Sequence, residues 1–241
     1  MIRNSLILNK IFRINPKTII HIGGHKGQDG PDYIKLGCEL VIWGEADSIS
    51  ASFIRERFPK DIVLESVFWN SPGLEIDFYE FNQNEGNSAI APIDNSKLTR
   101  KTKKITTTLD KELSKKSLPT PVLLVLDVQG AELHVLRGAS KLLEIIDFVI
   151  LEIGNQSQGY VEMPTDKQIN SLLKIYSFKP SIYRSSHDKM YRDHLFIKSS
   201  TFKVFYIKIT DIFISLFMYT RHLYRYKHVP DSIFYCRTCK I

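Results

Sequence analysis

Residues 121–133 read PVLLVLDVQGAEL and carry the strongest structural signal in the chain. The run over 121–126 is apolar without a break, as expected for a strand buried on both faces of a parallel sheet. Asp127 ends this run, Gly130 permits a sharp turn, and a helical pattern follows over 131–143. The segment therefore predicts a strand–turn–helix unit with a carboxylate at the edge of the sheet where ligands bind.

The same alternation of strands and helices extends over most of the chain. Apolar or β-branched runs predict strands at 18–22, 40–43, 62–64, 148–153 and 194–198, and an alternating pattern predicts an edge strand at 74–81. Helical patterns occupy residues 32–36, 48–58 and 165–176. We therefore expect an α/β fold, with a mostly parallel sheet, helices on both faces and ligands at its carboxyl edge.

Residues 81–117 do not fit this alternation. The segment is polar, contains Asn82, Asn84 and Asn87, and includes a basic cluster over 97–104. It is too long for an ordinary connection between elements of a compact domain. We expect it to be a functional lid or a mobile insertion.

Composition and charge restrict the class of protein. The 241 residues are 43% hydrophobic and 24% charged, which excludes a disordered or fibrous chain. Three cysteines, Cys38, Cys236 and Cys239, are too few for a disulfide framework, so a reducing, cytoplasmic location is expected. No secretory signal is evident at the N-terminus.

The net charge of +7 is concentrated at the C-terminal end. Residues 201–241 contain seven basic and two acidic side chains, a net of +5, which leaves only +2 for residues 1–200. A nucleic-acid-binding protein carries its positive charge on the working face of the domain. We therefore predict one domain over 1–200 with a basic tail over 201–241, and we do not expect nucleic acid as the partner.

The tail is aromatic as well as basic. Its most apolar window, 204–219, is interrupted by Lys208 and Asp211 and does not predict a transmembrane helix. Apolar residues followed by Arg221 and Arg225 suit a helix that packs on the body, forms a homodimer or contacts a membrane surface. Packing or dimerisation is favoured, because the apolar residues surround the helix instead of forming one stripe.

A glycine turn and an acid suggest a nucleoside site. The first strand ends in His21-Ile22-Gly23-Gly24-His25-Lys26-Gly27, where glycines let a ligand approach the backbone. Glu45 ends the next strand, 22 residues after Gly23, where a carboxylate can bind both hydroxyls of a ribose. Either feature alone is equally consistent with a tight turn or a solvated acid, but their joint occurrence favours a nucleoside.

Three carboxylates are expected to meet near the same edge. Asp127 and Glu152 each lie at the end of an apolar strand, and Glu132 lies in the first turn of the helix after Gly130. Capping of that helix is the alternative role for Glu132. Three acids at one cleft are otherwise typical of a functional site.

Residues 126–139, LDVQGAELHVLRGA, resemble the signature of the FkbM-type S-adenosylmethionine-dependent methyltransferases. The usual form of that signature is Asp-Val-Glu-Gly, a variable residue, Glu-Leu, and then Val-Leu-Lys-Gly-Ala. The glycine turn, Glu45, residues 107–110 and the strand ending in Glu152 follow the order of that family. The resemblance covers roughly residues 16–198.

The resemblance implies a Rossmann-like class I methyltransferase fold, a seven-stranded sheet with one antiparallel strand near its edge. It implies S-adenosyl-L-methionine as the cofactor and O-methylation of a hydroxyl on a sugar, glycan or natural product. Residues matching the donor-binding positions are His21, Gly23, Gly24, Gly27, Glu45, Ser66 and Asp127. Residues expected on the side of the small-molecule or glycan acceptor are Ser88, Glu132 and Glu152.

Methyl transfer to an aliphatic hydroxyl also needs a base. Asp127 and His25 are the predicted catalytic residues, because both follow strands at the ligand edge. His134 is a weaker candidate and is expected at the surface, since it lies two residues past Glu132 and faces another side of the helix. No metal site is predicted, and a hard cation on Asp127, Glu132 and Glu152 is the lesser alternative.

Two other functions stay open. His21 stands where the family usually has an acid, and Ala46 stands where a proline usually follows the ribose acid, which motivates a non-catalytic binding protein that retains the fold. The basic cluster over 97–104 and the basic tail motivate an RNA methyltransferase. A folded protein that does not bind the methyl donor would indicate the non-catalytic binding protein. Salt-dependent retention of RNA would indicate the RNA methyltransferase.

Overall fold

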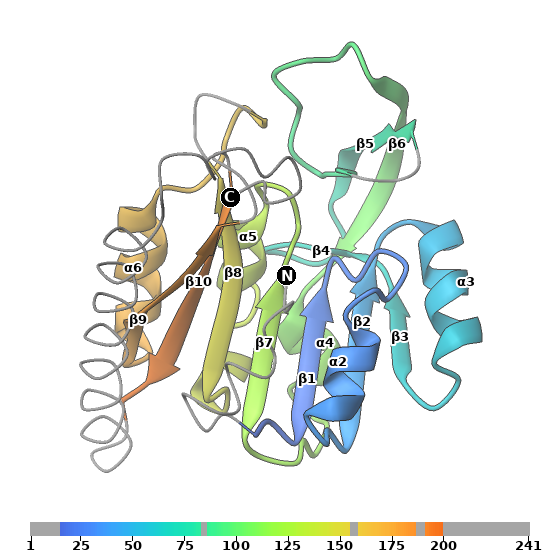
Figure 1. The fold of residues 1–241 in the computed structure, drawn as a ribbon. Helices are drawn as coiled ribbons and strands as arrows, with labels where there is room; N and C mark the ends of the chain where they lie inside the picture. The colour runs from blue at the N-terminus through green and yellow to red at the C-terminus, as the bar shows by residue number, and fades with distance from the viewer. Residues whose placement is uncertain (1–14, 83–85, 155–158, 187–190, 200–241) are drawn as a thin grey trace, which may run out of the picture.

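The fold is known from a computed structural model that describes residues 15–82, 86–154, 159–186 and 191–199 (Figure 1). The interpretations of the tail over 201–241, and of the N-terminal end, lie outside the described residues. Within the described part of the chain, no helix is long and apolar enough to cross a membrane.

The main sheet has seven strands in the order β3-β2-β1-β7-β8-β10-β9. The strands are β1 (Thr18–Ile22), β2 (Leu40–Glu45), β3 (Ile62–Glu65), β7 (Val122–Leu126), β8 (Phe148–Gly154), β9 (Phe178–Ser186) and β10 (Tyr191–Lys198). Pairing is parallel from β3 to β8, whereas β10 is antiparallel to both of its neighbours. The predicted α/β fold, with one antiparallel strand near the edge, is confirmed.

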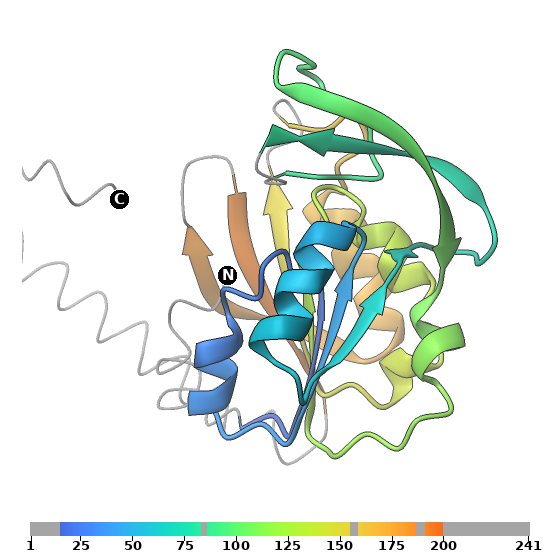
Figure 2. The ribbon, with the colours of Figure 1, turned by 90° about the vertical axis from the view of Figure 1, so that its right-hand side faces the viewer.

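The central strands are buried on both faces, which explains their unbroken apolar sequences. Successive side chains point to opposite faces, so Ile20 and Ile22 of β1 belong to one core and Ile19 to the other. The helices are α2 (Gly30–Lys35), α3 (Ser48–Arg57), α4 (Leu109–Leu113), α5 (Glu132–Arg137) and α6 (Asp166–Ile175). Residues of α2 and α3 share the core of Ile19, and residues of α4, α5 and α6 share the other (Figure 2).

A second sheet stands above the carboxyl ends of the central strands (Figures 1 and 2). It consists of β4 (Val67–Phe68), β6 (Leu98–Thr107) and β5 (Glu75–Phe81), in that order. The edge strand expected at 74–81 is confirmed, and the sheet whose edge it forms is this second one. The expected lid or mobile insertion at 81–117 contains instead the longest strand of this second sheet.

The reason for this difference lies in how β6 is stabilised. Its sequence, LTRKTKKITT, has no apolar alternation, because most of its side chains are partly or fully exposed. Cross-strand ion pairs join it to β5 instead: Lys101 and Lys103 both contact Asp77, and Arg100 contacts Glu80. A strand that is stabilised by ion pairs to its partner does not need alternating apolar residues. Its own sequence therefore gives no periodic pattern from which the strand could be predicted.

Two further boundaries differ from the sequence-based expectation. The helix expected over 131–143 ends at Arg137 and is followed by a 3-10 turn at Leu142–Glu144. Gly138 ends it at a close approach, since a Cβ there would lie 2.0 Å from the Trp69 carbonyl oxygen. Strand β9 was not predicted. It contains Pro180 and lies at the edge of the sheet, where proline is tolerated.

Candidate functional site

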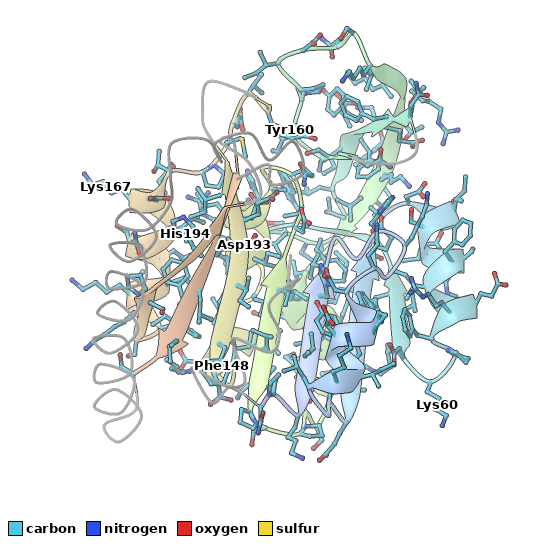
Figure 3. All side chains as sticks on the ribbon, in the orientation of Figure 1. Lys60, Phe148, Tyr160, Lys167, Asp193 and His194 are labelled. Atoms are coloured by element: carbon cyan, nitrogen blue, oxygen red, sulfur yellow. The ribbon has the colours of Figure 1, made fainter. Side chains whose placement is uncertain are left out.

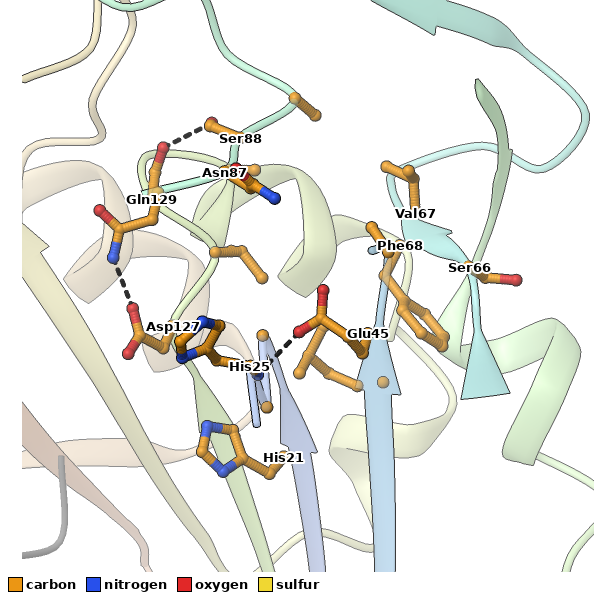
Figure 4. Close-up of a pocket in the computed structure, with 18 of the residues that line it drawn as sticks. His21, His25, Glu45, Ser66, Val67, Phe68, Asn87, Ser88, Asp127 and Gln129 are labelled. Carbon is orange, nitrogen blue, oxygen red and sulfur yellow. Dashed lines mark hydrogen bonds between the residues drawn. The ribbon is translucent and has the colours of Figure 1, made fainter. Parts of the chain in front are cut away.

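A cavity of about 560 Å³ opens at the carboxyl edge of the main sheet, beside the second sheet (Figure 4). Five segments line it: the turn after β1, the end of β2, the residues after β3, the loop over 86–89 and the turn after β7. The loops that follow parallel strands meet at this edge, where α/β proteins bind their ligands. Of the predicted site residues, the lining includes His21, Gly23, Gly24, His25, Glu45, Ser66, Ser88 and Asp127.

The glycine turn brings two strands into close contact. Gly23 has a φ of +84°, and a Cβ at this position would lie 1.8 Å from the Asp127 carbonyl oxygen. Its N–H donates to the carbonyl of Gly44 at 2.8 Å. Only glycine allows this backbone conformation and this approach, so the turn joins the ends of β1, β2 and β7. Gly27, also predicted to contact the cofactor, does not line the cavity and packs against Phe58.

Glu45 is a buried carboxylate at the end of β2. One of its oxygens accepts the N–H of His25 at 2.7 Å, and the other accepts the N–H of Asp47 at 2.8 Å. Burial raises its pKa to about 7, and the hydrogen bonds to backbone N–H groups oppose that rise. A carboxylate has about four lone-pair positions, so Glu45 retains acceptor capacity for a hydroxyl group.

His21 lies beside the cavity with its imidazole almost completely buried. Its ring packs on Trp43, with ring centroids 5.2 Å apart, and its Nδ1 is 2.8 Å from the hydroxyl of Tyr33. Burial lowers the pKa of His21 to about 4, so the ring is neutral at physiological pH. Its Nε2 is buried and has no hydrogen-bond partner within the described residues, which leaves one polar atom to be satisfied by a ligand.

Two acids share one amide at the end of β7, and Figure 4 shows its hydrogen bond to Asp127. Gln129 Nε2 donates to Asp127 at 2.7 Å and to Glu152 at 3.3 Å. Burial raises the pKa of Asp127 to about 6, and the nearby Asp193 contributes to the rise. Burial and the charge of Asp127 raise the pKa of Glu152 to about 9. At neutral pH, Asp127 is therefore ionised while Glu152 holds a proton.

Asp193 completes this acidic group from β10 (Figure 3). It is buried and lies opposite Glu152 in the antiparallel register. Within the described residues, no group of three histidine, cysteine or acidic side chains has the geometry to hold a metal ion. The acids at this edge are thus arranged around an amide, and the cation alternative finds no support in the described geometry.

Glu132 lies below the turn that follows β7. Its Oε1 accepts the N–H groups of Val128 and Gly130 at 3.3 and 3.2 Å, and burial raises its pKa to about 7. The carboxylate thus holds the turn that carries Gln129, which has a φ of 53°. Neither Glu132 nor Glu152 lines the cavity, and the predicted contact of each with the acceptor stays a prediction.

The loop over 86–89 forms one wall of the cavity. Ser88 donates to the Gln129 carbonyl at 2.7 Å, and the Tyr160 hydroxyl donates to the Gly86 carbonyl. Asn87 accepts the Phe81 N–H with its Oδ1, while its Nδ2 is buried without a hydrogen-bond partner among the described residues. This wall therefore presents an unused amide donor near the turn after β7.

The nonpolar part of the cavity was not predicted from the sequence. Val67 and Phe68 of β4 and Phe78 of β5 line it on the side of the second sheet. The Nζ of Lys104 lies 4.9 Å from the centroid of the Phe78 ring and donates to the Ala46 carbonyl at 2.6 Å, so it joins the second sheet to the end of β2. In the sequence, the one feature that could have indicated this part of the cavity is the apolar pair Val67-Phe68 after the third strand. Such pairs are too common to predict a binding site.

The two histidines considered as bases lie in different surroundings. His25 lines the cavity, has a φ of 46°, and its Nδ1 is 2.6 Å from Gln28 Nε2. His134 is half-buried, not at the surface as expected, and stacks on Trp69 with ring centroids 3.8 Å apart. His134 stacks on Trp69 and does not line the cavity, whereas His25 does. Of the two histidines, His25 is therefore the better placed to act as a base.

The fold and the site together define a Rossmann-like nucleoside-binding protein of the class I methyltransferase type. Comparison with known families agrees, because the methyltransferase FkbM domain matches residues 21–180, more than half of the chain. The chain belongs to this family, and it is an S-adenosylmethionine-dependent methyltransferase. The predicted family and cofactor are confirmed.

Solved structures of methyltransferases are similar to this chain at low identity. A ribosomal protein L11 methylase from Lactobacillus delbrueckii subsp. bulgaricus shares 12% identity over 81% of this chain and 77% of its own, with a TM-score of 0.47. Precorrin-6y C5,15-methyltransferase from Geobacter metallireducens shares 9% over 81% and 87%, with a TM-score of 0.45. Magnesium protoporphyrin IX methyltransferase from Synechocystis shares 12% over 81% and 79%, with a TM-score of 0.41. No curated protein matches the chain.

The residues of the cavity fit S-adenosylmethionine. The ligand carries a purine, two ribose hydroxyls, a sulfonium and an amino acid. Nonpolar side chains after β3 suit the purine, Glu45 retains acceptor positions for hydroxyls, and the acids near Asp127 suit positive charge. The buried Nε2 of His21 and Nδ2 of Asn87 are polar atoms that a bound ligand would satisfy.

Proposed function

We propose that this methyltransferase transfers the methyl group to a hydroxyl oxygen of a sugar, glycan or other hydroxylated small molecule. The observation that carries the proposal is the pair formed by Asp127 and Glu152 around Gln129. With a pKa of about 6, Asp127 is ionised at neutral pH yet is a stronger base than an ordinary aspartate. Such a carboxylate suits removal of a hydroxyl proton during transfer.

Donor binding follows from the geometry of the turn. Glu45 is assigned to the ribose hydroxyls, because its carboxylate faces the cavity and is fixed by two backbone N–H groups. Gly23 and Gly24 let the donor approach the backbone, and Ser66 lies beside the nonpolar side chains assigned to the purine. A carboxylate at this position would repel a 2′-phosphate, which supports an unphosphorylated ribose.

Acceptor binding is assigned to the wall formed by the loop over 86–89 and the turn after β7. Asn87 offers a buried amide donor, and Ser88 holds the loop against Gln129. Amide and carboxylate groups of this kind recognise hydroxyls through directional hydrogen bonds. The polar character of the wall supports a hydroxylated acceptor over a flat apolar one.

The reaction is an in-line displacement. S-adenosylmethionine supplies an electrophilic methyl group when it is bound. The chain must hold the acceptor oxygen at about 3 Å from the reacting carbon and must remove its proton. Asp127 accepts that proton, and Gln129 keeps its carboxylate oriented toward the cavity.

The proposal is tested with the full chain, S-adenosylmethionine and a panel of hydroxylated acceptors: glycosides, nucleotide sugars and alcohols of natural products. Mass spectrometry detects the methylated product, and NMR locates the methyl group. We expect an O-methyl product whose rate of formation falls about a hundredfold or more in Asp127→Asn. The control Asp94→Asn changes an exposed loop acid and should retain full activity.

Two results would contradict the proposal: a methyl group found on nitrogen or carbon, or an unchanged rate in Asp127→Asn. Calorimetry with S-adenosylhomocysteine separates catalysis from binding, because Asp127→Asn should still bind this product. The RNA alternative is less well supported, since three of the basic residues of β6 form ion pairs with Asp77 and Glu80. RNA in the same panel tests it directly.

A further inference from the structure

One basic residue of β6 differs from its neighbours in what it contacts. Arg100, Lys101 and Lys103 form ion pairs with acids of β5. Side chains alternate along a strand, so Lys104 points to the opposite face from Lys101 and Lys103. Within the described part of the chain Lys104 pairs with no acid, so cross-strand ion pairing does not explain its presence.

The Lys104 ammonium group contacts two parts of the cavity wall. It donates to the Ala46 carbonyl oxygen at 2.6 Å, and it lies 4.9 Å from the centroid of the Phe78 ring. Both partners line the cavity, whereas Lys104 itself does not. Any effect of Lys104 on a bound ligand therefore passes through the residues that it holds.

The Ala46 carbonyl belongs to the same peptide group as the N–H of Asp47. A peptide group is planar, so a contact that fixes its oxygen also fixes the direction of its N–H. That N–H donates at 2.8 Å to Oε1 of Glu45, the carboxylate assigned to the ribose hydroxyls. Hydrogen bonds at the two ends of one peptide group also polarise and strengthen each other. The Lys104 ammonium is thus connected to the Glu45 carboxylate through one rigid group.

The burial of Glu45 makes this connection important. Burial raises the pKa of its carboxyl group to about 7, while hydrogen bonds from backbone N–H groups, including that of Asp47, lower it. These bonds stabilise the ionised form, which has the full acceptor capacity for a hydroxyl. Rotation of the peptide group between Ala46 and Asp47 would remove the donor at Oε1, and the carboxylate could then turn away from the cavity.

We propose that Lys104 is a positioning residue for donor binding. It holds the peptide group between Ala46 and Asp47, and through that group it orients the Glu45 carboxylate toward the ribose. The inference rests on the proposed assignment of Glu45 to the ribose, and it does not depend on the identity of the methyl acceptor. The second sheet thereby contributes to donor recognition through the end of β2, in addition to the nonpolar wall that Phe78 provides.

Calorimetry with two probes tests this role: S-adenosylhomocysteine and its 2′,3′-dideoxy analogue, which lacks only the two ribose hydroxyls. The wild-type protein should bind the analogue about tenfold more weakly, the usual contribution of a hydrogen bond to a charged group. In Lys104→Met, S-adenosylhomocysteine should bind about fivefold more weakly and the analogue should keep its affinity, so the difference falls to about twofold. Lys103→Met is the matched control, because it removes an ion pair on the other face of β6 and should preserve the tenfold difference.

The dideoxy analogue also reports whether Lys104→Met folds, because its affinity should not depend on the Glu45 carboxylate. Lys104→Arg is a second variant, which retains a charged donor for the Ala46 carbonyl and should keep a larger difference than Lys104→Met. A difference in Lys104→Arg no larger than in Lys104→Met would overturn the positioning role.

Two outcomes for Lys104→Met would also overturn it. One is an unchanged tenfold difference between the probes, and the other is an equal loss for both probes, as expected from a merely structural contact. If the wild-type protein binds both probes equally, the assignment of Glu45 to the ribose fails, and the role of Lys104 fails with it. If the wild-type protein discriminates and Lys104→Met discriminates equally well, only the role of Lys104 fails.

Discussion

At the scale of single residues, the site depends on one neutral amide between two acids. Gln129 donates to both Asp127 and Glu152, so one amide group connects the two carboxyl groups. Burial gives them different pKa values, about 6 and about 9. A glutamate at position 129, the common residue in the family signature, would add a third acid and remove the donor.

The pH dependence of methylation should report the ionisation of Asp127. Because transfer needs the ionised carboxylate, we expect kcat/KM to fall about tenfold for each pH unit below 6. The charge of Asp193 raises the pKa of Asp127, so Asp193→Asn should move this acidic limb to lower pH. Initial rates measured between pH 4.5 and 8 provide the test.

Glu152→Gln is the control for this profile. Glu152 has a pKa of about 9 and is still protonated where Asp127 titrates, so its charge is absent there. The acidic limb should keep its position in this variant. A limb that moves in Glu152→Gln and stays fixed in Asp193→Asn would show that the base is not Asp127.

At the scale of elements, the glycine at position 23 in the turn after β1 is required for two reasons. Its backbone has a positive φ, and the backbone of Asp127 after β7 leaves no room for a Cβ atom. Gly23 and Gly37 both have positive φ, +84° and +72°. The Cβ of an alanine at 23 would overlap the Asp127 carbonyl, whereas one at 37 would meet no atom within 4 Å. The two positions therefore separate the cost of backbone strain from the cost of overlap.

Gly23→Ala should lower the free energy of unfolding by about 3 kcal/mol or more, through strain and overlap together. Gly37→Ala should cost only about 1–2 kcal/mol, because the left-handed conformation is the sole penalty there. Urea denaturation followed by circular dichroism measures both changes. Equal losses in the two variants would mean that β1 and β7 separate to accept the methyl group of alanine.

The elements themselves differ in how well the sequence predicts them. β1 and β7 are evident, because strands buried on both faces need unbroken apolar sequences. β6 is not evident, since ion pairs to β5 stabilise it and most of its side chains are partly or fully exposed. The helix α5 is predicted with the right start but the wrong end, because its end depends on contact with distant Trp69.

At the scale of the whole molecule, the cavity wall is assembled from two distant loops. The Tyr160 hydroxyl donates to Gly86, and residues 91 and 93 form backbone hydrogen bonds with residues 161 and 159 (Figure 3). Ile90, Tyr160 and Met163 form a small apolar cluster beneath these bonds. This cluster is separate from the two main cores, so the wall can open locally without unfolding of the sheet.

Tyr160→Phe should loosen this wall, because it removes one hydrogen bond and retains the ring. We expect amide hydrogen exchange in residues 86–93 to rise about tenfold, which corresponds to the contribution of one hydrogen bond. Tyr176→Phe, which follows α6, is the matched control and should leave this segment unchanged. Exchange measured by mass spectrometry would contradict the expectation if both variants behaved like the wild type.

The sequence by itself determined the class of fold, the cofactor through the family resemblance, and several of the residues that line the cavity. These properties depend on local patterns: an apolar strand followed by an acid and a glycine, repeated along the chain. Only the tertiary structure decided that Gln129 joins two acids, that the imidazole of His21 is buried against Trp43, and that Phe78 of the second sheet lines the cavity. The physical reason is that the charge and the orientation of a side chain depend on its burial and on contacts with residues far away in the sequence. The adjacent residues in the chain determine neither the burial nor these contacts.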